Sequence, residues 1–195
     1  MSAGGKETEI KLAVADLRAV RRQLRRLGLR VRAPRRFEQN TLFDTARGEL
    51  RRRGAMLRLR SVGSQHRLTF KGPAGESRHF KVRAEWEAAV DDPVAVRWLL
   101  AGLGFAPRFR YEKFRSEFAP RGRAGGCAML DETPIGNYLE LEGSRRWIRS
   151  LARALGFAQR DFIVRDYARL YFEWCRRRSR RPTHMVFPSR LSLSS

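Results

Sequence analysis

The chain has 195 residues and a formal net charge of +22, from 42 lysines and arginines against 20 aspartates and glutamates. Hydrophobic residues make up 42% of it, which is enough for a core and excludes a chain that is disordered throughout. The sequence has no apolar run of membrane-spanning length and opens without the apolar stretch of a signal peptide, so we expect a cytoplasmic protein with no membrane partner. All but five of the basic residues are arginine, which makes polyanions the expected class of partner.

The first predicted elements are a strand and a helix. Polar and apolar residues alternate from residue 7 to 14, and apolar residues then recur at helical spacing between Asp16, a typical helix cap, and Gly28, a typical helix end. Alternation near residues 38–45, 55–62, 65–71 and 78–88 predicts four further strands. The first half of the chain is therefore predicted to be mostly strand.

The second half repeats this layout. A helix is predicted between the caps Asp92 and Gly104, and another between Ser144 and Gly156. Strands are predicted near 108–118, 126–131 and 137–142, and a last helix over 166–175. Residues 1–175 are thus expected to form one domain. The tail over 176–195 has six arginines, no acid and no periodicity, and is expected to be disordered.

Nearly every predicted strand has one apolar face and one charged face. Successive side chains of a strand point to opposite sides, so Arg58 and Arg60 share a face that is opposite Leu57 and Leu59. The same rule gives charged faces elsewhere, made of Glu7, Glu9 and Lys11; of Lys71; of Lys81, Arg83, Glu85 and Glu87; of Lys113 and Arg115; and of Glu140 and Glu142. An open sheet with one face in water is the simple explanation for any one strand.

The number of these charged faces favours a closed barrel. We expect an α+β fold in which eight antiparallel strands close around a charged lumen, with helices packed outside on the apolar faces. Unpaired buried charges cost several kcal/mol per ion, so such a lumen requires a bound polyanion. Carboxylates beside that anion are typical ligands of Mg²⁺ or Mn²⁺. The expected ligand is a small-molecule triphosphate or polyphosphate.

Several segments resemble the CYTH or triphosphate tunnel metalloenzyme family, in that family's order. They are ETEIKL at 7–12, QNTLFDT at 39–45, LRLR at 57–60, LTFKGP at 68–73, EWE at 85–87, KFR at 113–115, LDETPIGNYLELEG at 130–143 and DYARLY at 166–171. The family includes thiamine triphosphatases, inorganic triphosphatases and class IV adenylate cyclases. The resemblance covers about residues 5–175.

The resemblance assigns roles to residues of this chain. It implies that metal is bound by Glu7, Glu9, Glu85, Glu87, Asp131, Glu140 and Glu142. It implies that triphosphate is held by Lys11, Arg58, Arg60, Lys71 and Arg115, to which the strand faces add Arg83 and Lys113. Catalysis is expected from Glu7, Glu9, Lys11 and Arg165, where Arg165 stands at a position at which many members have a lysine.

The expected activity is metal-dependent hydrolysis of inorganic triphosphate or a small organic triphosphate. A class IV adenylate cyclase, which makes cyclic AMP and pyrophosphate from ATP, is the alternative, since no sequence feature separates the two. A non-catalytic polyphosphate or nucleic-acid binding protein is the alternative of another class. Acid pairs at matching spacing argue against nucleic-acid binding by the body of the chain, so it is expected only through the basic tail. A homodimer is a further expectation.

Overall fold

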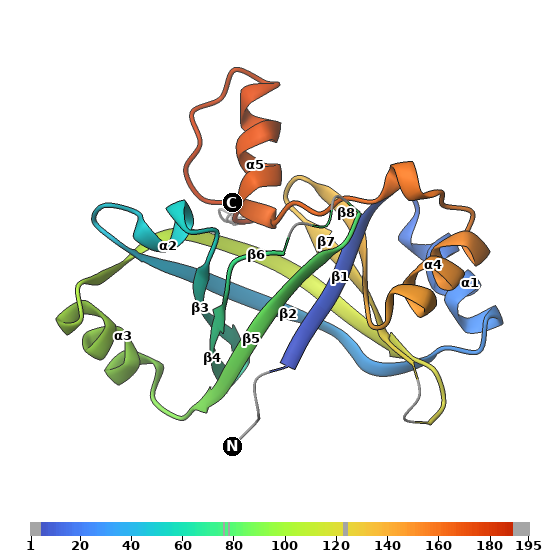
Figure 1. The fold of residues 1–195 in the computed structure, drawn as a ribbon, viewed down its shortest axis with the longest axis horizontal. Coiled ribbons are helices and arrows are strands. Elements are labelled where there is room, and N and C mark those ends of the chain that lie inside the picture. Colours follow the sequence, from blue (N-terminus) through green and yellow to red (C-terminus); the bar gives the residue numbers. More distant parts are fainter. Residues whose placement is uncertain (1–4, 76, 78, 123–124, 189–195) are drawn as a thin grey trace, which may run out of the picture.

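A closed barrel forms the body of the protein. The structure is a computed structural model that describes residues 5–75, 77, 79–122 and 125–188. Within these residues eight strands close in the order β1-β5-β4-β3-β2-β6-β7-β8, and every neighbouring pair is antiparallel (Figure 1). The strands are β1 (Gly5–Val14), β2 (Arg30–Thr45), β3 (Met56–Val62), β4 (Gln65–Lys71), β5 (Lys81–Val90), β6 (Phe105–Ala119), β7 (Cys127–Thr133) and β8 (Gly136–Glu142). The predicted α+β barrel is confirmed.

The helices lie outside the barrel. They are α1 (Leu17–Arg26), α2 (Glu49–Arg52), α3 (Pro93–Gly102), α4 (Arg145–Ala154) and α5 (Tyr167–Arg176), with a short 3-10 helix η1 (Gln159–Asp161) before α5. Asp16 and Asp92 accept hydrogen bonds from the first amides of α1 and α3, as their positions predicted. Helix α2 was not predicted from the sequence, because its single turn is too short for a periodic pattern.

The main core lies between the barrel wall and two of these helices. Ile10 and Leu12 of β1 point outward and belong to one buried cluster with Leu24 of α1 and Ile148 of α4. In Figure 1, α1 and α4 lie together at one end of the barrel. The apolar faces of the strands are therefore buried outside the barrel, which leaves the charged faces for the lumen.

The first part of the predicted tail, residues 177–188, is described by the structure, and a segment of it lies along β6. We call residues 183–188 the strap. Met185 is fully buried, its amide donates to the Arg110 carbonyl (3.0 Å), and its carbonyl accepts from the Glu112 amide (2.9 Å). The pairing of β6 with β7 begins only at Phe114, so this part of β6 has a free edge that the strap covers. The expected disorder of residues 189–195 falls outside the described residues.

No helix in the described part of the chain is long and apolar enough to cross a membrane.

Candidate active site

The barrel encloses a cavity of about 770 Å³ whose walls are mostly charged. Its lining includes most of the residues that the sequence assigned to the site. They are Glu7, Glu9, Lys11, Arg58, Arg60, Lys71, Arg83, Glu85, Glu87, Lys113, Arg115, Glu140 and Glu142. Strand register brings them together: Glu9 lies opposite Glu142, and Lys11 lies opposite Glu140, although about 130 residues separate the partners in the chain.

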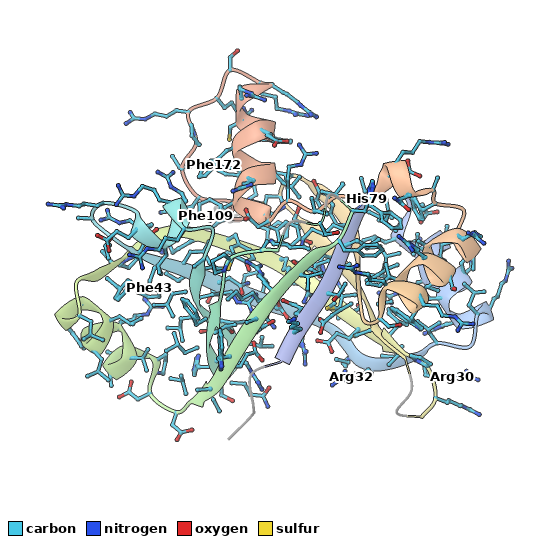
Figure 2. The ribbon with its side chains drawn as sticks, in the orientation of Figure 1. Arg30, Arg32, Phe43, His79, Phe109 and Phe172 are labelled. Atoms are coloured by element: carbon cyan, nitrogen blue, oxygen red, sulfur yellow. The ribbon has the colours of Figure 1, made fainter. Side chains whose placement is uncertain are left out.

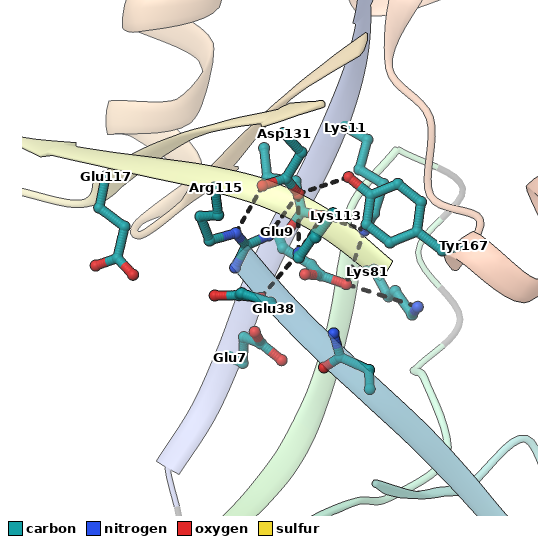
Figure 3. Close-up of polar contacts among 12 residues, drawn as sticks. Glu7, Glu9, Lys11, Glu38, Lys81, Lys113, Arg115, Glu117, Asp131 and Tyr167 are labelled. Carbon is teal, nitrogen blue, oxygen red and sulfur yellow. Dashed lines mark hydrogen bonds and ion pairs between the residues drawn. The ribbon is translucent and has the colours of Figure 1, made fainter. Parts of the chain in front are cut away.

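One end of the cavity is closed by α5, and Tyr167 at the start of this helix lies over the lumen (Figure 3). Its hydroxyl donates to Asp131 Oδ2 (2.6 Å), and the Nζ atoms of Lys11 and Lys113 lie 5.3 and 5.0 Å from its ring centre. Burial, followed by the Asp131 charge, raises the pKa of Tyr167 well above its usual value, so this hydroxyl keeps its proton. Figure 2 shows Phe109 of β6 close to Phe172 of α5 behind this end.

Asp131 fixes the cations at the closed end. Its Oδ1 accepts from Arg115 Nε (2.7 Å), and its Oδ2 accepts from Lys113 Nζ (2.9 Å) and Arg115 Nη2 (2.6 Å) in addition to Tyr167. The side chain is fully buried and does not line the cavity. With both oxygens occupied, Asp131 positions Lys113 and Arg115 and is not brought into the group of acids that face the cavity.

Among the described residues, three buried cations have a nitrogen that lacks a hydrogen-bond partner, as has the half-buried Arg36 at its Nε. The three nitrogens are Lys81 Nζ, Arg58 Nε and Arg83 Nε. Burial lowers the pKa of Lys81 to about 8, although Glu9 lies 3.6 Å away and opposes this shift. A buried donor without an acceptor costs about 1–3 kcal/mol, which the oxygens of a bound anion would relieve.

Three acids gather on the neighbouring wall. Lys71 Nζ lies 2.5 Å from Glu7 Oε2 and 2.8 Å from Glu85 Oε2. Burial and the adjacent Glu7 raise the pKa of Glu85 to about 7. Burial and Glu7 likewise raise the pKa of Glu142 to about 7. Negative charge at this wall is therefore only partly compensated by Lys71.

These acids have the chemistry of a site for a hard divalent cation. Carboxylate oxygens are the ligands that Mg²⁺ and Mn²⁺ prefer. Burial, followed by the nearby Glu7 carboxylate, raises the pKa values of Glu85 and Glu142, and a bound cation would favour their ionised forms. No group of three or more acidic, histidine or cysteine side chains in the described residues has a ready metal-binding arrangement. Because the Lys71 ammonium lies between Glu7 and Glu85, a metal ion would have to displace it.

Arg165 is not brought into the site. Its side chain is 43% exposed and pairs with Glu173 on the outer side of α5, and it does not line the cavity. The following residue, Asp166, caps α5 by accepting from the Arg169 amide and lines the cavity instead. The chain thus enters α5 in a direction that points the Arg165 side chain away from the cavity.

Several residues of the cavity wall were given no binding or catalytic role from the sequence, although Lys81 was placed on a charged strand face. They are Arg32, Arg36, Glu38, Lys81, Tyr111, Glu117, Asp166 and Tyr167. Alternation along β5 and β6 places Lys81 and Glu117 on the same strand faces as the predicted site residues, so the sequence pattern could have identified both. On β2 the signal is weaker, because register shifts between Val31 and Arg36 interrupt the alternation.

Comparison with known proteins agrees with this architecture. Residues 5–154 match the CYTH domain. A Methanocaldococcus jannaschii protein named "putative adenylate cyclase" is 28% identical over 174 residues, which cover 84% of this chain and 97% of that protein. A solved Vibrio parahaemolyticus structure with the same description has a TM-score of 0.74 at 19% identity and covers 86% of this chain and 98% of its own.

A plant structure shares the fold as well. The Hippeastrum protein described as a "putative adenylyl cyclase" has a TM-score of 0.61 at 18% identity, covering 90% of this chain and 97% of that one. At these identities the solved structures establish a common fold. The domain match spans most of the chain, and the chain therefore belongs to the CYTH domain family, whose fold is the triphosphate tunnel.

Proposed function

We infer that the barrel lumen is the active site of a divalent-metal-dependent hydrolase that acts on inorganic triphosphate or a small organic triphosphate. The observation that carries this inference is the set of buried cations with unpartnered nitrogens, Lys81, Arg58 and Arg83, in the same cavity as the acids Glu7, Glu85 and Glu142. The cations can donate hydrogen bonds to the oxygens of a phosphate chain. The acids can bind the metal ions that accompany such chains.

The cations of the lumen would hold and orient the phosphate chain. Arg58 and Arg83 would donate to phosphate oxygens, while Asp131 and Tyr167 keep Lys113 and Arg115 in place. Donors that are fixed before the substrate arrives need no rearrangement as charge develops on the departing diphosphate. This arrangement favours the transition state over the bound substrate.

Glu7, Glu85 and Glu142 are the residues that would hold a divalent ion, with Glu9, Glu87 and Glu140 beside them. When bound, such an ion supplies Lewis-acid neutralisation of phosphate charge. Lys71, which now lies between two of these acids, would then be free to contact a phosphate oxygen.

Adenylate cyclisation is the second candidate. It is favoured by the Methanocaldococcus jannaschii relative, whose name is "putative adenylate cyclase". The Hippeastrum protein is described as having a dominant triphosphatase activity, which supports hydrolysis as the first candidate for a lumen of this kind. Both reactions require the triphosphate to be bound in the same way, and they differ in the phosphorus atom that the nucleophile attacks.

Product analysis tests the proposal. Inorganic triphosphate, thiamine triphosphate and ATP would each be incubated with Mg²⁺, Mn²⁺ or EDTA, and orthophosphate, pyrophosphate and nucleotides would be quantified. We expect orthophosphate that depends on the metal and is lost in Glu9→Gln, with Arg153→Ala, an exposed position on α4, as the matched control. Cyclic AMP with pyrophosphate would favour the cyclase, and the absence of turnover in all conditions would favour a binding protein.

A further inference from the structure

Glu38 of β2 has the most unusual environment of the carboxylates in the lumen. Its side chain is fully buried in the cavity wall. Among the described residues, it is the carboxylate for which both oxygens are buried and lack a hydrogen-bond partner. The other buried acids differ: Asp131 accepts four hydrogen bonds, and Glu140 Oε2 lies 2.9 Å from Arg115 Nη2.

The neighbours of Glu38 are cations that form long ion pairs with it and no hydrogen bond. Lys113 Nζ lies 3.8 Å from Glu38 Oε2 (Figure 3), and Arg60 Nε lies at the same distance from this oxygen. Both distances are beyond hydrogen-bond range. Lys113 is already engaged by Asp131 at 2.9 Å, so it is held away from Glu38. An ionised carboxylate offers about four acceptor positions, and those of Glu38 are left for a group that is not part of the protein.

The charges around Glu38 decide what that group is. Arg58, Arg60, Lys113 and Arg115 surround it, and they would repel a metal ion from this position. A phosphate oxygen bound by the same cations would in turn be repelled by the carboxylate. A neutral O–H group is the ligand that satisfies Glu38 and can also lie beside a bound phosphate.

We propose that Glu38 accepts a hydrogen bond from the nucleophilic water and orients its oxygen toward the terminal phosphorus, a role that rests on the proposed triphosphatase function. The water oxygen donates an electron pair to phosphorus, and the bond from phosphorus to the bridging oxygen breaks with its electrons on the departing diphosphate. Both protons of the water remain with the orthophosphate product, since Glu38 accepts a hydrogen bond and takes up no proton. Glu38 is then a catalytic residue of the cation-lined wall, separate from the acids that fit a metal.

The test separates orientation of water from binding of the phosphate chain. Glu38→Gln keeps the size of the side chain and replaces one acceptor oxygen by an amide. We expect kcat for the best triphosphate substrate to fall at least about 100-fold, the size typical of a reacting group that is no longer held in position. The KM and the affinity for a non-hydrolysable imido analogue of triphosphate should stay the same or improve, because a repulsive charge beside the phosphates is removed.

Two further variants complete the test. Glu132→Gln makes the same substitution at a carboxylate that pairs with Arg35 (2.8 Å) away from the lumen, and it should leave kcat unchanged. Glu38→Ala should regain part of its activity with added formate, which can enter the vacated space and accept the same hydrogen bond. A KM that rises while kcat is kept, or a loss of analogue binding in Glu38→Gln, would overturn the proposal. Wild-type protein that binds the analogue but never turns over substrate would instead refute the triphosphatase function.

Discussion

At the level of single residues, the lumen contains two kinds of buried charge. Asp131 has all of its hydrogen-bonding capacity filled by Lys113, Arg115 and Tyr167, whereas Arg58 and Lys81 have nitrogens without a partner. A filled network stabilises the fold, and an unfilled one costs stability unless a ligand completes it. The two kinds should therefore respond differently to substitution.

Asp131→Asn tests the filled network. The substitution leaves Lys113 and Arg115 buried beside a neutral amide, and removing one partner of a buried ion pair typically costs about 3 kcal/mol. We expect the free energy of unfolding, measured by urea denaturation, to fall by about that amount. Unchanged stability together with a lost response to Mg²⁺ would support a metal-ligand role for Asp131 instead.

Arg58→Ala tests a buried cation that has a nitrogen without a hydrogen-bond partner. Arg58 contributes a buried guanidinium whose Nε has no acceptor, and a hydrogen bond to a charged group is worth about 1.5–3 kcal/mol. We expect the KM for inorganic triphosphate to rise roughly 10-fold or more with little change in melting temperature. Steady-state kinetics and a thermal melt check this, and a collapse of the fold with normal binding would contradict it.

At the level of secondary-structure elements, most of the fold could be predicted from the sequence and part of the site could not. Each helix cap and each two-residue alternation is a local signal, so most predicted strands and long helices lie close to their observed positions. Strand β2 differs, because it begins at Arg30 and not near residue 38. The outward direction of Arg165 depends on how α5 starts over the barrel, and the paired state of Asp131 depends on Tyr167, 36 residues away in the chain. Such contacts have no local signal.

The strap is the element that was hardest to predict from the sequence. "THMVFP" at 183–188 is short, and its pairing partner is a stretch of β6 more than 70 residues away in the chain. Met185 and Phe187 alternate as in a strand, and Phe187 packs against Phe37 and Phe114. Its order comes from the free edge of β6 and not from its own composition.

Met185→Ala tests the strap. Truncation of a fully buried methionine typically costs about 2 kcal/mol or more. We expect a lower free energy of unfolding and faster proteolysis after α5, whereas Val186→Ala, at a position 38% exposed, should change little. Equal stability of the two variants would show that the strap does not contribute to the folded state.

At the level of the whole molecule, the outer surfaces of the helices are unequal. The outward faces of α1 and α4 carry arginines such as Arg22 and Arg153, whereas α3 exposes Trp98 (74%), Leu99 (67%) and Leu103 (72%). Val94 is 60% exposed as well, and several exposed apolar side chains on one element are typical of an interaction site. The expected homodimer would use these exposed apolar side chains of α3, since a second copy could cover them.

Analytical ultracentrifugation checks the homodimer prediction. We expect a dimer for the wild-type protein and a monomer for Trp98→Glu, with turnover kept because Trp98 does not line the cavity. A wild-type monomer at micromolar concentration would contradict this use of α3.

Binding of a triphosphate in the charged lumen underlies every functional proposal made for this protein, and titration calorimetry with inorganic triphosphate in EDTA tests it without requiring turnover. Because the net charge is high, triphosphate can also bind weakly to arginines on the outer surface. The experiment must therefore identify where the anion binds as well as how tightly it binds. We expect one tight site per chain in the wild type and in Arg153→Ala, and at least about 10-fold weaker binding in Arg58→Ala. Several weak sites that weaken in Arg153→Ala and are unaffected by Arg58→Ala would show that the anion binds outside the lumen.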